Sequence, residues 1–379
     1  MNIYDIEETL KKEIENISEY IFNHPELGNE EFQSSQYLVD VLKSHGFDVE
    51  YPYCDIPTSF RAEFKKGEGR KVAFLAEYDA LPGYGPNKDE VAHACGHNWI
   101  AASCLGAAIT LSKLENISGT IVVIGTPAEE TTGGKCELVM KHAFDDIDAA
   151  IQMHLGAENN INVVTLAMDS IEFTFKGKAS HAAAYPELGV NALDAVQLTF
   201  AGINALRQHM KADARVAGII TDGGMACNIV PDHASCQFYI RAAQREYVQI
   251  LTEKIINCAK GACLMTGCEM DYRFFENSFD DLVYNEELRT DLKKSLNELG
   301  ICSFVEDDSQ ASGSSDIGNV SHVCPTVYCE LDTQANPKVY AHNEDFLEYV
   351  HGTNAEETLH IACKAMATTA LHVLEGMKL

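Results

Sequence analysis

The stretch Lys71-Val72-Ala73-Phe74-Leu75-Ala76-Glu77-Tyr78-Asp79 decides the fold, because it is a short apolar run that ends directly in ionisable residues. Residues 120–125 and 148–153 have the same apolar character, which is typical of strands buried on both faces. Between the first two runs, residues 98–114 carry apolar side chains at helical spacing. Strand, helix and strand in this order form the βαβ unit of a parallel sheet, so the sequence predicts an α/β fold with helices on both faces.

Ionisable residues follow each of these predicted strands. In an open α/β sheet the carboxyl ends of neighbouring parallel strands meet at one edge, and binding sites lie there. The side chains expected at this edge include Asp79, Cys95, His97, Glu129, Glu130 and His154. Carboxylate, imidazole and thiolate groups are the ligands that zinc prefers. The pattern therefore predicts a metal-dependent hydrolase.

Each motif taken alone also has a structural interpretation. The triplet Cys95-Gly96-His97 by itself is more often structural, and a Cys nucleophile with a His base is a further alternative. Glu129 and Glu130 in isolation fit an exposed acidic turn. In company with the other ligands, one of these carboxylates is expected to bind metal while its neighbour transfers protons.

Composition limits the classes of function. Fifty-seven acidic residues against twenty-eight basic ones give a formal net charge of −29, which disfavours nucleic acid and anionic membranes as partners. The thirteen cysteines show no Cys-x-x-Cys spacing, so neither a disulfide framework nor a zinc ribbon is expected. The N-terminus lacks the basic start and apolar stretch of a signal peptide, and no run approaches the ~20 apolar residues of a membrane span. We expect a cytoplasmic protein.

A second domain is predicted, because 379 residues exceed the ~250–300 at which single cores stop growing. The periodicity after residue 169 reads strand, helix, strand, strand, helix, strand, which is the ferredoxin-like βαββαβ arrangement. From about residue 281 the earlier α/β pattern resumes. We therefore expect a catalytic domain of residues 1–168 and 281–379, with an inserted dimerisation or lid domain of residues 169–280.

Several motifs occur in one order along almost the whole chain. They are Glu77-Tyr78-Asp79-Ala80-Leu81-Pro82, His93-Ala94-Cys95-Gly96-His97-Asn98, Pro127-Ala128-Glu129-Glu130, Met153-His154, Asn228-Ile229-Val230-Pro231-Asp232 and Gly313-Ser314-Ser315-Asp316. This set resembles the dinuclear metal amidohydrolases and metallopeptidases, which include carboxypeptidase G, aminoacylases and N-acyl-amino-acid amidohydrolases. Glu77-Tyr78-Asp79 and Asn98 are most similar to the branch of p-aminobenzoyl-glutamate hydrolase and the β-alanyl-lysine-type dipeptidases.

The resemblance implies a role for each matching residue. Two divalent ions, zinc or manganese, would be held by Cys95, His97, Glu130, His154 and His342. Glu129 would be the general base, and Asp79 would orient a ligand imidazole. His181 would reach across a homodimer to stabilise the oxyanion, although a loop His is the competing interpretation. Asn228 and Arg241 would hold the substrate and its carboxylate, although Arg241 also fits an exposed strand end.

The expected reaction is hydrolysis of an amide bond by a metal-activated water. The small-molecule substrate would be an N-acyl amino acid, an aminobenzoyl-glutamate-like conjugate or a dipeptide. Two alternatives belong to other classes. One is a metal-free thiol hydrolase that uses Cys95, and the other is a non-catalytic ligand-binding or regulatory protein on the same fold.

Overall fold

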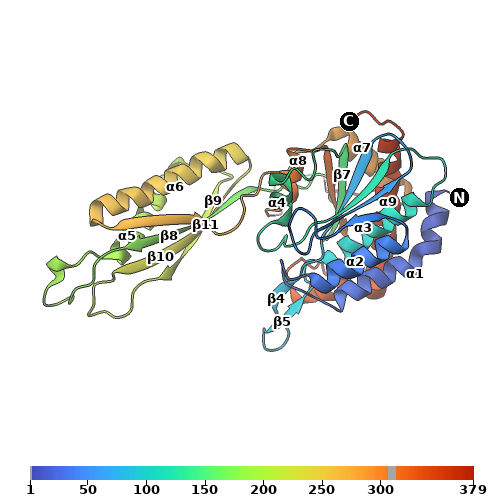
Figure 1. The fold of residues 1–379 in the computed structure, drawn as a ribbon. Coiled ribbons are helices and arrows are strands. Elements are labelled where there is room, and N and C mark those ends of the chain that lie inside the picture. The colour runs from blue at the N-terminus through green and yellow to red at the C-terminus, as the bar shows by residue number, and fades with distance from the viewer. Residues whose placement is uncertain (1, 306–312) are drawn as a thin grey trace. The chain divides into compact units, whose positions relative to one another are not determined.

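The computed structural model describes residues 2–305 and 313–379 (Figure 1). The chain divides into two compact units. The large unit comprises Met1–Val164, Leu282–Ser312 and Asp316–Leu379. The small unit comprises Thr165–Asp281 and Gly313–Ser315, so it interrupts the large unit in sequence.

A six-stranded sheet in the order β1-β2-β6-β3-β7-β12 forms the centre of the large unit. Its strands are β1 (Asp48–Glu50), β2 (Phe60–Lys65), β3 (Lys71–Ala76), β6 (Thr120–Gly125), β7 (Ala149–Gly156) and β12 (Thr326–Asp332). The four strands from β6 to β12 run parallel, whereas β1 and β2 pair antiparallel at one edge. The mostly parallel sheet that the sequence predicts is confirmed.

Helices cover both faces of this sheet. They are α1 (Ile3–Phe22), α2 (Phe32–Ser44), α3 (His97–Ser112), α4 (Gly134–Met140), α7 (Glu286–Glu298), α8 (Ile317–Ser321) and α9 (Gly352–Leu374). Alternate side chains of β3 enter different cores, with Val72 and Phe74 on one face and Ala73 and Leu75 on the other. The large unit is therefore a three-layer α/β structure.

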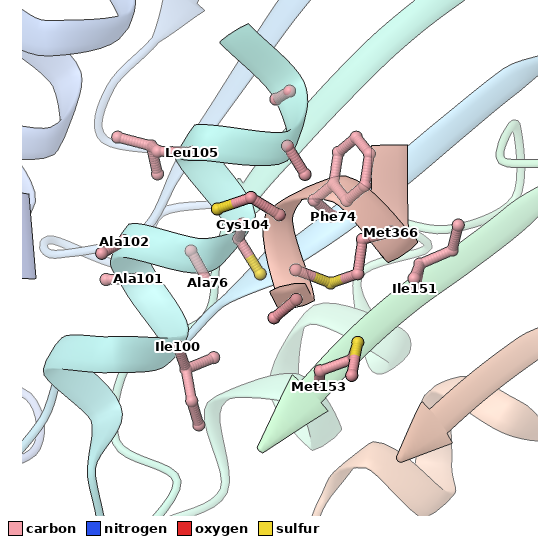
Figure 2. Close-up of a cluster of buried hydrophobic side chains, with 14 of the residues drawn as sticks. Phe74, Ala76, Ile100, Ala101, Ala102, Cys104, Leu105, Ile151, Met153 and Met366 are labelled. Carbon is pink, nitrogen blue, oxygen red and sulfur yellow. The ribbon is translucent and has the colours of Figure 1, made fainter. Parts of the chain in front are cut away.

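Helix α3 is buried along its entire length. It contacts α1 and α9 as well as β3, which explains why its sequence is apolar all round. Figure 2 shows part of this core, with Phe74 of β3, Leu105 of α3 and Met366 of α9. The N-terminus of α3, which carries His97, is consequently held rigidly at the carboxyl edge of the sheet.

The small unit is a four-stranded antiparallel sheet in the order β11-β8-β10-β9. Its strands are β8 (Ala167–Lys176), β9 (Arg215–Asp222), β10 (His233–Ala242) and β11 (Glu269–Phe274), with the helices α5 (Ala192–Leu206) and α6 (Arg245–Thr266). Both helices pack on one face of the sheet (Figure 1). The predicted βαββαβ order is confirmed, although the first helix ends at Leu206 and continues as a 3₁₀ turn, Arg207–His209.

Two further observations concern the described residues. None of their helices is both long and apolar enough to cross a membrane. All thirteen cysteines lie among these residues, and each is a free thiol.

Candidate metal centre

The predicted ligands of the large unit lie together beyond the carboxyl ends of β3, β6 and β7. Gly96 adopts a φ of +82°, a conformation that favours glycine, and forms the turn that starts α3. This turn brings Cys95 and His97 into one cluster with His154, with their ligand atoms within 4.8 Å of one another. The thiol sulfur of Cys95 lies 3.5 Å from His154 Nε2.

A second cluster consists of Cys95, Glu130 and His342, again with ligand atoms within 4.8 Å of one another. The backbone N–H of His342 donates to Ala94 O at 2.8 Å, which joins the loop of His342 to the segment that carries Cys95. Cys95 therefore belongs to both clusters. The sequence predicts these five residues as ligands, and the structure brings all five together.

Hydrogen bonds orient two of the imidazoles. With Nδ1 protonated, His97 donates to Asp79 Oδ1 at 2.7 Å and His154 donates to Leu155 O at 2.5 Å. In each ring this leaves the Nε2 lone pair directed at the cluster, as in metal sites whose ligand histidines are held by an outer partner. Asp79 thus lies where it can orient His97.

The adjacent carboxylates Glu129 and Glu130 differ in their surroundings. Burial, and then the charge of Glu130, raise the pKa of Glu129 well above its ordinary value. Burial alone would also raise the pKa of Glu130, but His342 and His97 outweigh it and lower that pKa. Two neighbouring carboxylates with opposite shifts are suited to different tasks, proton transfer for Glu129 and ligation for Glu130.

The donor set fits divalent cations. The atoms His97 Nε2 and Glu130 Oε1 are buried and make no hydrogen bond of acceptable geometry, although Glu130 Oε1 lies 3.1 Å from His342 Nε2. Buried polar atoms without partners are rare, and a cation between them would satisfy both. A thiol, imidazoles and a carboxylate are also the donor types of zinc sites.

The structure disfavours a metal-free thiolate at Cys95. Burial, and then the Glu130 carboxylate, raise the pKa of the Cys95 thiol well above its ordinary value. A nucleophilic cysteine needs the opposite shift.

The three remaining predicted site residues belong to the small unit. His181 and Ile229 form an isolated β-bridge, and Ala182 N–H donates to Asn228 O at 3.0 Å, so His181 and Asn228 lie on paired segments. The exposed His181 ring accepts hydrogen bonds at Nδ1 from the N–H groups of Ala183 and Ala184 at 3.3 and 3.1 Å. In the neutral ring the proton is then on Nε2, which is free to donate.

Arg241 lies at the other end of the same sheet. Asn228 precedes the first residue of β10, whereas Arg241 is the last residue but one of that strand. At about 3.3 Å per residue, β10 separates the two ends by ~26 Å from His233 to Arg241. Within one small unit, Arg241 and the pair His181 and Asn228 therefore cannot contact the same small substrate.

Comparison with known proteins identifies the family. The model of peptidase family M20/M25/M40 matches residues 73–376, which cover most of the chain and all the motifs above. The chain belongs to this family. It is therefore a metal-dependent hydrolase of amide or peptide bonds.

Relatives of the M20/M25/M40 chain support the predicted branch. The Xaa-Arg dipeptidase of Mus musculus is 36% identical over 377 residues, covering 94% of this chain and 85% of the mouse protein. A p-aminobenzoyl-glutamate hydrolase polypeptide of Escherichia coli is 36% identical over 314 residues, covering 79% and 65% of the two chains. A dinuclear metal-binding M20 peptidase from Bacillus subtilis has the same fold, with a TM-score of 0.73, 21% identity, and coverage of 97% and 99%.

Beside the metal centre of this M20/M25/M40 chain lies a buried cation that the sequence does not signal. Glu77, Glu129 and Asp316 form a third acidic cluster. The Lys135 ammonium donates to Asp316 Oδ1 at 2.7 Å and to Glu77, and its own backbone N–H donates to Asp316 Oδ2 at 2.9 Å. Because this ammonium already neutralises the acidic cluster, we do not interpret the cluster as a further metal site.

Replacement of this lysine should be costly. We expect Lys135→Met to lower the free energy of unfolding by about 3–5 kcal/mol, because it leaves buried carboxylates without their cation. The measurement is urea denaturation. Lys141→Met is the matched control, because the Lys141–Asp55 pair is largely exposed and should contribute at most about 1 kcal/mol. Equal effects of the two substitutions would contradict this prediction.

Proposed function

We propose that Cys95, His97, Glu130, His154 and His342 hold two divalent ions, zinc or manganese, in each subunit. The observation that carries this proposal is the membership of Cys95 in both ligand clusters, because a shared thiolate links two adjacent ions. Zinc suits the mixture of sulfur, nitrogen and oxygen donors, and manganese suits sites richer in carboxylate.

In this mechanism the bound ions lower the pKa of a water molecule and polarise the scissile carbonyl. Glu129 accepts the proton of the attacking water and delivers it to the leaving amine, a task that its raised pKa favours. Asp79 keeps the His97 ring fixed through the bond to Nδ1. His181 donates from Nε2 to the oxyanion, and Arg241 binds the substrate carboxylate with its planar fork.

The substrate class that we put first is a dipeptide with a basic C-terminal residue. Its support is the similarity to the Xaa-Arg dipeptidase, which extends over 94% of this chain. The second candidate is an aminobenzoyl-glutamate-like conjugate, supported by the equal identity to the p-aminobenzoyl-glutamate hydrolase polypeptide over a shorter stretch.

A screen of the purified protein with added manganese or zinc tests this choice. It compares dipeptides ending in arginine or lysine with aminobenzoyl-glutamate and with N-acetyl amino acids. We expect the highest kcat/KM for the dipeptides. Cleavage of N-acetyl amino acids alone would contradict both candidates.

We further propose a homodimer that shares its active sites. Strand β9 is an edge strand whose side chains Ile219 and Ile220 are 62% and 48% exposed, a surface suited to pairing with a twin. Since Arg241 lies ~26 Å along β10 from the His181 end, one site that uses both residues needs two chains.

The shared site predicts complementation between inactive variants. We expect His181→Ala to lower kcat by about 10²–10³-fold with normal metal content, because it removes one oxyanion donor. Heterodimers of His181→Ala with Glu129→Gln subunits, co-expressed with two tags and purified, should regain part of the activity, because one of their two sites is intact. Inactive heterodimers whose subunits are folded and metal-loaded would contradict the shared site.

We also propose that the protein works in the reducing cytoplasm, without nucleic acid or membrane partners. The thirteen free thiols and the net charge of −29 support this proposal.

A further inference from the structure

The segment between α1 and α2, residues 26–31, runs along the two strand ends that carry Asp79 and Glu129. Leu27 forms a parallel bridge with Ala80, whose N–H donates to Glu26 O at 2.8 Å. Asn29 Nδ2 donates to Thr132 Oγ1 at 3.1 Å. The 26–31 segment therefore contacts both the end of β3 and the turn that follows β6.

The contact with this turn is close enough to require glycine. A Cβ atom added at Gly28 would collide with Thr131 Oγ1 and would lie 3.0 Å from Ala128 Cα. The backbone of the 26–31 segment is thus packed directly against the residues on either side of Glu129 and Glu130.

Glu31 has a buried carboxylate that its position in sequence does not explain. It precedes the first residue of α2, where an acidic side chain usually caps the helix, but it makes no such bond. Glu26 caps α2 instead, accepting from the N–H groups of Gln33 and Ser34 at 3.0 and 2.8 Å.

The Glu31 carboxylate is directed into the core. It is fully buried and accepts from Thr58 Oγ1 at 2.9 Å and from the N–H of Ala128 at 2.8 Å. Ala128 has a φ of +61°, which residues other than glycine rarely adopt, and it immediately precedes Glu129. On the other side, Glu130 N–H donates to Asp79 Oδ2 at 2.9 Å. Two buried carboxylates therefore hold this turn, one at each end.

We propose that Glu31 is a positioning residue, which holds Ala128 in its left-handed conformation and thereby fixes the direction of the Glu129 side chain. It acts through the backbone and does not touch substrate. This inference rests on the proposed role of Glu129 as general base. It extends the site to the 26–31 segment, which lies about a hundred residues earlier in the sequence.

Three substitutions at Glu31 test the proposal. Glu31→Ala and Glu31→Asp remove the acceptor or withdraw it from Ala128, and a displacement of about 1 Å in a catalytic group can cost ~10²-fold in rate. We expect kcat to fall by up to this factor while KM and metal content stay near wild-type values. Glu31→Gln keeps an oxygen for the Ala128 N–H and should retain most of kcat. Burial and the Asp79 charge raise the pKa of Glu31 to about 7, so glutamine also mimics its protonated form.

Hydrogen exchange of the metal-free protein gives a readout that is independent of activity. The Ala128 amide should exchange faster in Glu31→Ala and Glu31→Asp than in the wild type, and should stay protected in Glu31→Gln. Glu30→Ala is the matched control, because the neighbouring Glu30 is exposed and should change neither exchange nor kcat.

Wild-type kcat and unchanged Ala128 exchange in folded Glu31→Ala would overturn the proposal. Loss of kcat in Glu31→Gln equal to that in Glu31→Ala would overturn it as well. If Glu31→Ala does not fold, Glu31→Asp and Glu31→Gln decide by the same criteria. Glu129→Gln is measured in parallel, because wild-type kcat in that variant would refute the general-base role separately, whatever the exchange at Ala128.

Discussion

Glu129→Gln should lower kcat by about 10²–10⁴-fold, the usual contribution of a general acid–base group, and should leave the metal content unchanged. The amide cannot accept the proton of the attacking water, but Glu129 belongs to neither of the two clusters that share Cys95. The measurement combines steady-state kinetics with elemental analysis of the same protein sample.

Glu130→Gln is the matched comparison, because it makes the same chemical change at the adjacent position. Glu130 belongs to the cluster of Cys95 and His342, so its replacement should reduce metal content first and activity as a consequence. Added metal should then restore part of the activity of Glu130→Gln but none of that of Glu129→Gln. Metal loss in Glu129→Gln alone would reverse the two assignments.

The fold was predictable where local pattern and burial coincide. The runs that become β3, β6 and β7 are apolar because both faces of these strands are covered, and the small unit alternates because one face is open. The antiparallel strand β2 was not predicted, and neither were the short β1 and the helix α2. Their formation depends on pairing and packing with distant segments, which a local pattern does not contain.

The candidate site was predictable only for residues in recognisable motifs. The ligand set and Asp79 lie in such motifs, and the structure brings them together. Lys135 and Glu31 lie in stretches that look like ordinary exposed turns, and their partners are 58 to 181 and 27 to 97 residues away. Asn98, a residue that indicates the branch, donates to Ser18 Oγ and Val350 O and so contacts neither metal cluster. Such long-range partners become visible only in the folded chain.

Removal of metal should abolish turnover, and Cys95 should matter most for its binding. Cys95→Ala removes a ligand from both clusters, whereas His154→Ala or His342→Ala removes a ligand from one. We therefore expect a lower metal content in Cys95→Ala than in either histidine variant. Alkylation of the exposed thiols, Cys227 and Cys302, should leave turnover unchanged and serves as the control for thiol chemistry.

The most direct measurement is a reconstitution titration, in which turnover and bound metal are determined on the same samples after chelation and stepwise addition of zinc or manganese. We predict no turnover in the metal-free protein, a return of activity with bound metal, and saturation at two ions per subunit, as expected of a two-metal site. Full turnover in protein shown by elemental analysis to be free of metal would contradict the account.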